Sequence, residues 1–345
     1  MYKILAVGPA WIGDTVLAQP LFRRLREAHD DLVLDVFAPP WTFPVLRRMP
    51  EVSSVLNNPF AHGELNVAGR FAFAHQLRDS AYDQAVVLPN SFKSALLPWF
   101  ARIPLRTGYV GEFRYVLLND ARRLDVGTLP LMVERYAALG QSAATPLVRP
   151  LPQPRLTTSP VTRAAVLARL AIDAGTPLAC LCPGAEYGPA KRWPEAYFAQ
   201  LASRLVRDGY RVVTLGSSKD REIGDKIAQL SNGAAIDLCG ETTLDEAVDL
   251  LACARLCVSN DSGLMHVAAA VGVPLLALYG SSSPAFTPPL SETAQILKLD
   301  LACSPCFQRV CPLQHFNCMM QLTPDRVYAA LGNLDAAAHP MSPAQ

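Results

Sequence analysis

Short apolar runs alternate with amphipathic helical patterns along the second half of this 345-residue chain. Each apolar run is too short for a helix, while the segments between them place apolar residues three or four positions apart, as on one helix face. We predict strands over 178–182, 211–215, 236–238, 256–259 and 274–279. The predicted helices cover 194–208, 220–230, 243–254 and 264–272. This alternation predicts an α/β fold with a parallel, doubly wound sheet.

The first half repeats the alternation less regularly, with predicted strands over 3–7, 32–37 and 84–88 and helices over 15–28 and 91–100. Between the halves, residues 146–160 contain five prolines and no helical period, which indicates a linker. The length of the chain also suits two domains better than one. We therefore expect two Rossmann-like domains that face a central cleft. Their predicted bounds are 1–155 and 161–330, followed by a tail over 331–345.

Polar turns follow several of the predicted strands, and in such sheets ligands bind at the carboxyl ends of the strands. One turn carries two adjacent cations, Lys191 and Arg192, and another opens a helix whose free backbone N–H groups favour an anion. The combination suits a diphosphate. The residues expected to bind the substrate are Gly13, Gly184, Lys191, Arg192, Ser217, Asp261, Ser262, Gly263 and His266. For Ser217, and for the residues 260–262, helix capping is the alternative interpretation.

The first predicted strand ends in a glycine turn, Gly8 to Asp14. Its two glycines have P-loop spacing, but Asp14 follows Gly13 where a P-loop needs lysine, and no G-x-G-x-x-G fingerprint is present. Both nucleotide-binding motifs are therefore excluded. A carboxylate held at the end of a strand by a glycine turn suits a general base. The alternative is that Asp14 caps the following helix.

Composition indicates a soluble globular protein, because half of the residues are hydrophobic and the charges nearly balance. No apolar run is long enough to span a membrane, and the N-terminus resembles a first strand more than a signal peptide. We expect a cytoplasmic protein without a nucleic-acid partner. Residues 1–150 carry 16 basic and 13 acidic side chains. A solvated face explains this excess, but it also permits an anionic partner. Within 93–123 the basic residues are Lys93, Arg102, Arg106, Arg114, Arg122 and Arg123.

The nine cysteines fall into two groups. Five lie in apolar segments and are predicted to be core thiols: Cys180, Cys182, Cys239, Cys253 and Cys257. The other four form a C-x2-C-x4-C-x6-C pattern: Cys303, Cys306, Cys311 and Cys318. They either bind a metal such as zinc or are structural thiols, and the spacing leaves both interpretations open. No Asp-x-Asp motif occurs, so we expect charge on a leaving diphosphate to be met by protein groups without a metal ion.

Four segments together resemble the ADP-heptose:lipopolysaccharide heptosyltransferases: Gly13-Asp14, residues 89–95, residues 183–194 and residues 260–266. The resemblance covers the chain to about residue 330 and is closest to the enzymes that add the second heptose of the inner core. It implies a GT-B fold in which the first domain binds the acceptor and the second binds ADP-heptose. It also implies inverting transfer. The roles it implies are Asp14 as general base, Lys191 on the diphosphate, residues 261–266 against the donor, and Asn90, Ser91 and Lys93 toward the acceptor.

The expected reaction moves L-glycero-D-manno-heptose from ADP-heptose to the first heptose of heptosyl-Kdo2-lipid A, without a cofactor. Because that acceptor is an acidic glycolipid, we expect peripheral contact with the inner face of the cytoplasmic membrane. One alternative is a family member that adds the first or third heptose. Others are a sugar-nucleotide epimerase or hydrolase, and a non-catalytic sugar-nucleotide-binding protein. The acceptor hydroxyl, the need for acceptor phosphate and the oligomeric state do not follow from the sequence.

Overall fold

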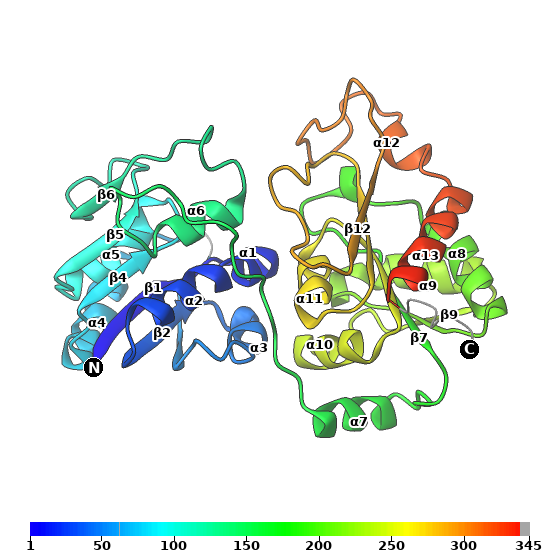
Figure 1. Cartoon of the computed structure of the whole chain (residues 1–345), viewed down its shortest axis with the longest axis horizontal. Helices are drawn as coiled ribbons and strands as arrows, with labels where there is room; N and C mark the ends of the chain where they lie inside the picture. The colour runs from blue at the N-terminus through cyan, green and yellow to red at the C-terminus, as the bar shows by residue number, and fades with distance from the viewer. Residues whose placement is uncertain (62, 339–345) are drawn as a thin grey trace, which may run out of the picture. The chain divides into compact units, whose positions relative to one another are not determined.

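The computed structural model describes residues 1–61 and 63–338, and the chain divides into two compact units. The first unit is Met1–Pro154, and the second begins at Arg155. Each unit contains a six-stranded sheet with all strands parallel and helices on both faces (Figure 1). The prediction of a doubly wound α/β fold is confirmed for both halves.

The strand order of the first sheet is β3-β2-β1-β4-β5-β6. Its strands are β1 (Tyr2–Val7), β2 (Leu32–Ala38), β3 (Ser54–Asn57), β4 (Gln84–Val87), β5 (Leu105–Tyr109) and β6 (Asp120–Arg122). The helices are α1 (Ile12–Leu17), α2 (Gln19–Ala28), α3 (Phe43–Leu46), α4 (Val67–Leu77), α5 (Phe92–Phe100) and α6 (Met132–Ala138), with 3-10 turns η1 (Pro40–Thr42) and η2 (Arg78–Ser80). The order reverses between β1 and β4, which pair from Ile4↔Gln84 to Val7↔Val87. The turns after these two strands therefore open at a topological switch point.

The second sheet has the order β12-β11-β10-β7-β8-β9, the same topology as the first. Its strands are β7 (Leu178–Cys182), β8 (Arg211–Thr214), β9 (Ala235–Asp237), β10 (Leu256–Asn260), β11 (Leu275–Tyr279) and β12 (Ala294–Lys298). The helices are α7 (Pro160–Arg169), α8 (Glu195–Arg207), α9 (Arg221–Leu230), α10 (Leu244–Cys253), α11 (Gly263–Val271), α12 (Asn317–Met320) and α13 (Pro324–Ala338), with 3-10 turns η3 (Pro189–Lys191) and η4 (Ser218–Asp220). Here the switch point lies between β7 and β10, which pair from Leu256↔Ala179 to Ser259↔Cys182.

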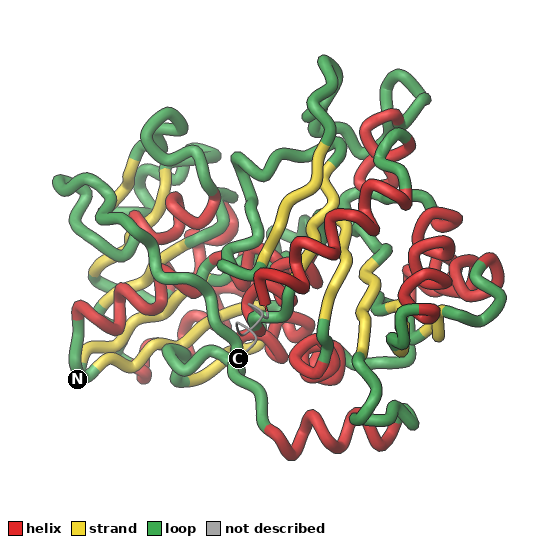
Figure 2. Tube along the Cα trace, turned by 45° about the vertical axis from the view of Figure 1, so that its right-hand side comes forward, coloured by secondary structure: helices red, strands yellow, loops and turns green. Residues whose placement is uncertain are grey.

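Strands β7, β10 and β11 are buried along their whole lengths. Parallel strands covered by helices on both faces must be apolar on both sides, which is why these runs gave the clearest sequence signal. On one face, α8, α9 and α13 enclose a core that includes Phe198, Ile227 and Val327. On the other face, α10 packs against α7 and α11. Figure 2 shows the strands of this sheet side by side between the two layers of helices.

Three predicted bounds need correction. The helix predicted over 15–28 is interrupted at Ala18, because Pro20 lacks an N–H and stands in the first turn of α2. The second unit begins before residue 161, since Leu156 is buried and its N–H donates to Ala270 O at 2.9 Å. The predicted tail over 331–345 is wrong for its first part. Helix α13 continues to Ala338, with Leu331 and Leu334 in the core, and residues 339–345 lie outside the described part of the chain.

Candidate functional site

Two turns at the switch point of the second sheet are held together by one buried amide. Asn260 ends β10 and is fully buried. Its side-chain oxygen accepts from the Trp193 backbone N–H at 3.1 Å, and its side-chain nitrogen donates to Pro183 O at 2.7 Å. The turn after β7 is therefore hydrogen-bonded at both of its ends to one residue of β10. These bonds give the two turns a fixed geometry relative to each other.

An ion pair joins the same two turns. Lys191 Nζ lies 2.6 Å from Asp261 Oδ2, and the side chains are 17% and 5% exposed. The hydroxyl of Ser282, which follows β11, donates to the same carboxylate oxygen. The ammonium also lies 5.1 Å from the centre of the Tyr187 ring, where a cation is attracted to the ring face. Lys191 is therefore a positioned, half-buried cation, and an entering diphosphate would compete with Asp261 for it.

Helix α11 starts directly after Asp261, with Ser262 as its N-cap and Gly263 as its first residue. The Ser262 side chain makes no capping hydrogen bond, so the capping interpretation is wrong for this residue. The first backbone N–H groups of the helix are consequently left for another acceptor. His266 lies one turn further along and is buried. Burial lowers the pKa of His266 to about 4, Lys191 acts in the same direction and Asp261 opposes it, so the imidazole is neutral at pH 7.

The buried, neutral state of His266 predicts a pH dependence of stability. Because the folded-state pKa of about 4 lies below the ordinary 6.5, the unfolded chain binds a proton first as the pH falls. This group therefore costs stability from about pH 6.5 down to about pH 4, by roughly 3 kcal/mol in total. We expect His266→Gln to lose less unfolding free energy than wild type over that range in urea titrations. His75→Gln, on the exposed side of α4, is the control and should follow wild type. Parallel curves for wild type and His266→Gln would contradict the burial of a neutral imidazole.

The remaining predicted residues of the second unit have different surroundings. A Cβ at Gly184 would lie 2.6 Å from Asp220 Oδ1, so glycine is needed for the close approach of the turn after β8. In that turn, Ser217 donates from its N–H and its hydroxyl to the Asp220 carboxylate at 2.9 and 2.8 Å. The capping interpretation therefore describes Ser217 in this structure. Arg192 has a buried Nε without a hydrogen-bond partner, which leaves one donor for an anionic ligand.

In the first unit, Asp14 lies in the first turn of α1, the helix that follows β1 at the switch point. The N-cap of α1 is Trp11 and Asp14 is the third residue of the helix, so the alternative interpretation, that Asp14 is the N-cap, is wrong. Gly13 precedes it in the first turn. The pKa of Tyr136 in α6 is raised by burial and further by the Asp14 charge, and α1 and α6 pack against each other. The chain before α1 is fixed in place, because Trp41 Nε1 donates to Ala10 O at 2.7 Å.

The turn after β4, on the other side of the same switch point, carries Asn90 and Ser91, and Lys93 is the second residue of α5, which follows it. The buried Arg114 stabilises this turn by donating to Asn90 Oδ1 at 3.1 Å and to Ser91 O at 3.3 Å. Asn90 itself remains exposed, and Ser91 is the N-cap of α5 without a side-chain cap bond. Burial lowers the pKa of Arg114 to about 10, although Glu112 acts against this shift. The guanidinium is therefore charged at neutral pH and serves as an internal brace.

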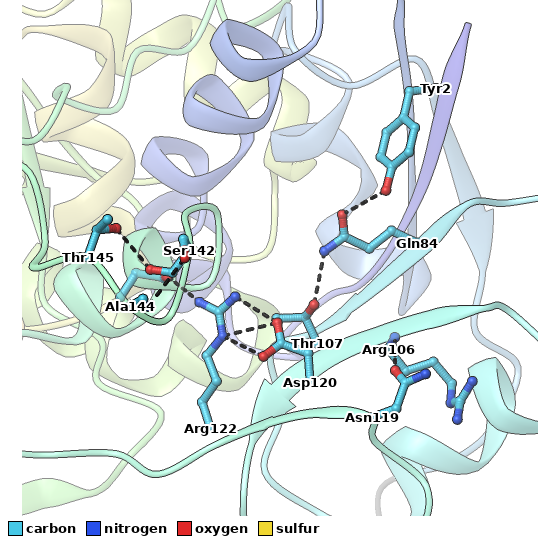
Figure 3. Close-up of polar contacts among 11 residues, drawn as sticks. Tyr2, Gln84, Arg106, Thr107, Asn119, Asp120, Arg122, Ser142, Ala144 and Thr145 are labelled. Carbon is cyan, nitrogen blue, oxygen red and sulfur yellow. Dashed lines mark hydrogen bonds and ion pairs between the residues drawn. The ribbon is translucent and has the colours of Figure 1, made fainter.

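The basic residues over 93–123 do not all form a surface patch. Arg114 is fully buried, and Arg106 donates to Leu117 O at 2.7 Å and to Ile103 O at 2.6 Å. Figure 3 shows Arg122 against the Asp120 carboxylate, with 2.7 Å between the paired atoms. The interpretation of this excess as a solvated face therefore does not hold for Arg114, Arg106 and Arg122, because a sequence does not distinguish a solvated arginine from one that binds carbonyls or a carboxylate. The other three are exposed or half-buried: Lys93, Arg102 and Arg123.

Sequence reasoning missed three contributors to the site. Asn260 lies in the segment 260–266, but the sequence does not indicate that its side chain joins the two turns. Ser282 follows β11 in the small polar turn after Tyr279, the same signature that marked the other turns, and was overlooked. No local pattern in the sequence indicates the role of Arg114.

Four of the five predicted core cysteines are buried, and Cys253 is partly buried. In the described residues no helix has the length and apolarity to cross a membrane.

Two Rossmann-like domains, each with polar turns at its switch point, define the GT-B class of glycosyltransferases. Residues 70–317 match Glycosyltransferase family 9 (heptosyltransferase), and the chain belongs to this family. It is 46% identical over 341 residues to lipopolysaccharide heptosyltransferase 2 of Salmonella typhimurium, covering 96% of this chain and 98% of the relative. The corresponding Escherichia coli K12 protein is 45% identical over 341 residues, with the same coverage. The motif resemblance is confirmed, and the chain is a heptosyltransferase of lipopolysaccharide core biosynthesis.

Solved structures agree with this assignment. The structure of E. coli ADP-heptose lps heptosyltransferase II superposes with a TM-score of 0.88 at 43% identity, covering 97% of this chain and 99% of that one. E. coli heptosyltransferase WaaC with ADP superposes with a TM-score of 0.70 at 20% identity, covering 96% and 99%. At that identity the second likeness shows the fold alone.

Proposed function

We propose that this enzyme transfers L-glycero-D-manno-heptose from ADP-heptose to the first heptose of heptosyl-Kdo2-lipid A, with inversion at the anomeric carbon. The observation that carries the donor assignment is the cluster of Lys191, Asp261 and Ser282 at the switch point of the second sheet. The choice of acceptor is supported by the relatives of 45–46% identity, which are named heptosyltransferases 2.

In the proposed donor complex, the diphosphate of ADP-heptose accepts from Lys191 and from the first N–H groups of α11. The buried Nε of Arg192 adds a donor in the same turn. Asp261 keeps Lys191 in position and offers a carboxylate to the donor, next to the neutral His266. Negative charge grows on the β-phosphate oxygen as its bond to the anomeric carbon breaks. A positioned ammonium and a helix N-terminus stabilise such charge without reorganising.

Asp14 is the proposed general base of the first unit. The acceptor hydroxyl attacks the anomeric carbon on the face opposite the diphosphate, a C–O bond forms, and the hydroxyl proton moves to the Asp14 carboxylate. One carboxylate is enough for this step, because ADP is a good leaving group and needs no second acid. We propose Asn90, Ser91 and Lys93 as acceptor contacts, since their turn lies beside that of Asp14 at the switch point.

The proposed acceptor is an acidic glycolipid, so we place the enzyme in the cytoplasm, in peripheral contact with the inner membrane surface. Lys93, Arg102 and Arg123 are the cations over 93–123 that remain for such a surface. Attraction of this kind is weak for each cation and is screened by salt.

A panel of acceptors tests the proposal. The enzyme is incubated with ADP-heptose and Kdo2-lipid A carrying no, one or two heptoses, while ADP release and glycolipid mass are followed. We expect ADP release and a gain of one heptose with the mono-heptosylated acceptor. Preference for the acceptor with no heptose or with two would assign the first or third transfer instead. ADP-heptose consumption without any acceptor would indicate a hydrolase or epimerase.

We also predict that transfer needs no added divalent cation. The chain has no Asp-x-Asp motif, and Lys191 and the α11 N-terminus supply the positive charge that a metal would provide. Activity in excess EDTA should remain close to that of the untreated enzyme. A collapse of activity that magnesium or manganese restores would show that these groups are insufficient.

A further inference from the structure

Four cysteines surround a small cavity in the second unit. The cavity has a volume of about 20 Å³, and its wall includes Cys303, Cys306, Cys311, Cys318, His315 and Ser281. We call it the cysteine cavity. All four thiols are free. The C-x2-C-x4-C-x6-C pattern thus brings its thiols to one place in the fold, although the proposed heptosyl transfer uses none of them.

The segment that carries Cys311 folds into a tight turn beside the cavity. The Gln314 N–H donates to Cys311 O at 3.1 Å, and Asn317 N–H donates to His315 Nδ1 at 3.0 Å. These bonds hold Cys311 and His315 in the wall of the same cavity. The metal-binding form of cysteine is the thiolate.

Ser281 supplies an independent observation. Its side chain is 1% exposed, lines the cysteine cavity, and has an Oγ without a hydrogen-bond partner. Buried hydroxyls nearly always have a partner, so an orphaned one points to an occupant that completes the site. No aspartate or glutamate lines the cavity, which excludes the oxygen-rich environment that calcium or magnesium requires. Sulfur ligands select zinc or iron.

We propose that the cysteine cavity binds one thiophilic metal ion, zinc or iron, through the thiolates of Cys303, Cys306, Cys311 and Cys318. Among the described residues no three Cys, His, Asp or Glu side chains already form a set of metal ligands. Binding therefore draws the four sulfurs inward onto the ion. A tetrahedral site of four thiolates is closed to substrate, so the ion is structural.

The cysteine cavity and the Lys191–Asp261 ion pair are built from neighbouring residues of the same turns. Ala190 and Ser281 line the cavity wall, and the residues that follow them, Lys191 and Ser282, both bind the Asp261 carboxylate. The cysteine segment is also bonded to these neighbours. Phe307 N–H donates to Ser281 O at 2.7 Å, and Ala190 N–H donates to Arg309 O at 3.0 Å. An ion that fixes the segment 303–318 therefore also supports the turn that carries Lys191.

Metal analysis of the purified full-length enzyme tests this proposal. Elemental analysis should find about one zinc or iron per chain, retained through gel filtration. Cys306→Ser and Cys311→Ser should each lose most of it. Cys253→Ser, a partly buried cysteine outside the cavity, is the matched control and should keep the full amount. Loss of the ion should also weaken ADP binding by roughly tenfold, the effect of about one lost hydrogen bond.

If the serine variants do not fold, wild-type protein suffices. A mercurial reagent that caps the thiols should release the metal, detected by a chromogenic chelator. Wild-type protein that contains no metal, and whose thiols react with Ellman's reagent at the same rate with and without added zinc chloride, would overturn the proposal. Metal content is read without any transfer assay, so this outcome would leave the proposed donor and acceptor standing.

Discussion

Asp14→Asn should abolish heptosyl transfer while leaving ADP-heptose affinity within a few fold of wild type. The substitution keeps the size of the side chain but removes the group that accepts the acceptor proton. Loss of a general base typically lowers the rate by roughly 10²–10⁴. Asp14 lies inside the first turn of α1, so part of its charge also favours the helix dipole. Loss of this interaction with the helix dipole would lower the melting temperature, which is measured separately from kcat.

The measurement compares kcat, ADP-heptose affinity and melting temperature for Asp14→Asn and wild type. Asp30→Asn, exposed ahead of β2, is the matched control and should change none of them. Turnover close to wild type together with a lowered melting temperature would show that Asp14 only stabilises α1. Loss of both turnover and ADP-heptose affinity would move Asp14 from catalysis to donor binding.

Lys191→Ala should lower kcat/KM by roughly 10- to 150-fold, since a charge-assisted hydrogen bond contributes about 1.5–3 kcal/mol. The diphosphate is charged before the reaction, so part of the loss should appear as weaker binding of both ADP and ADP-heptose. Charge also grows on the leaving oxygen, so a further part should appear in kcat. The structure adds a second reason for a large effect. Without Lys191, the Asp261 carboxylate loses its ion-pair partner and stands unneutralised beside the incoming phosphates.

Two further variants separate charge from geometry. Lys191→Arg should recover only part of the loss, because a planar guanidinium replaces a compact ammonium between Asp261 and the Tyr187 ring. Lys226→Ala removes an exposed lysine of α9 and is the matched control, expected to match wild type. Equal kcat/KM for Lys191→Ala and Lys226→Ala would contradict a role for Lys191 at the donor.

The regular part of the fold was predictable because burial on both faces leaves a strong apolar signal. Strands such as β7 and β11 were predicted to within a residue or two for that reason. Strands β3, β5, β6 and β12 were missed, because they are short or half-exposed and carry polar residues. Helix α4 was missed although its signal was present: Asn66 caps it, accepting from Gly69 N–H at 3.0 Å.

The sequence predicted which turns form the site, but not which side chains in those turns bind each other. Parallel topology places the turns after β7 and β10 together, so Lys191 and Asp261 were assigned to one site. That they bind each other depends on side-chain geometry across 70 positions of sequence, which no local pattern encodes. The same limit explains why the role of Arg114 was missed. Its guanidinium donates to Pro89 O, just after β4, and to Tyr109 O, at the end of β5.

Isothermal titration of ADP and AMP into wild type and Lys191→Ala tests the central claim, that Lys191 at the second switch point meets the β-phosphate. AMP lacks that phosphate and keeps the rest of the nucleotide, so the ratio of the two affinities isolates it. Wild type should prefer ADP, and Lys191→Ala should lose most of that preference while binding AMP nearly as before. An ADP-to-AMP ratio that is the same in both proteins would contradict the claim, and the donor site would then have to be assigned without Lys191.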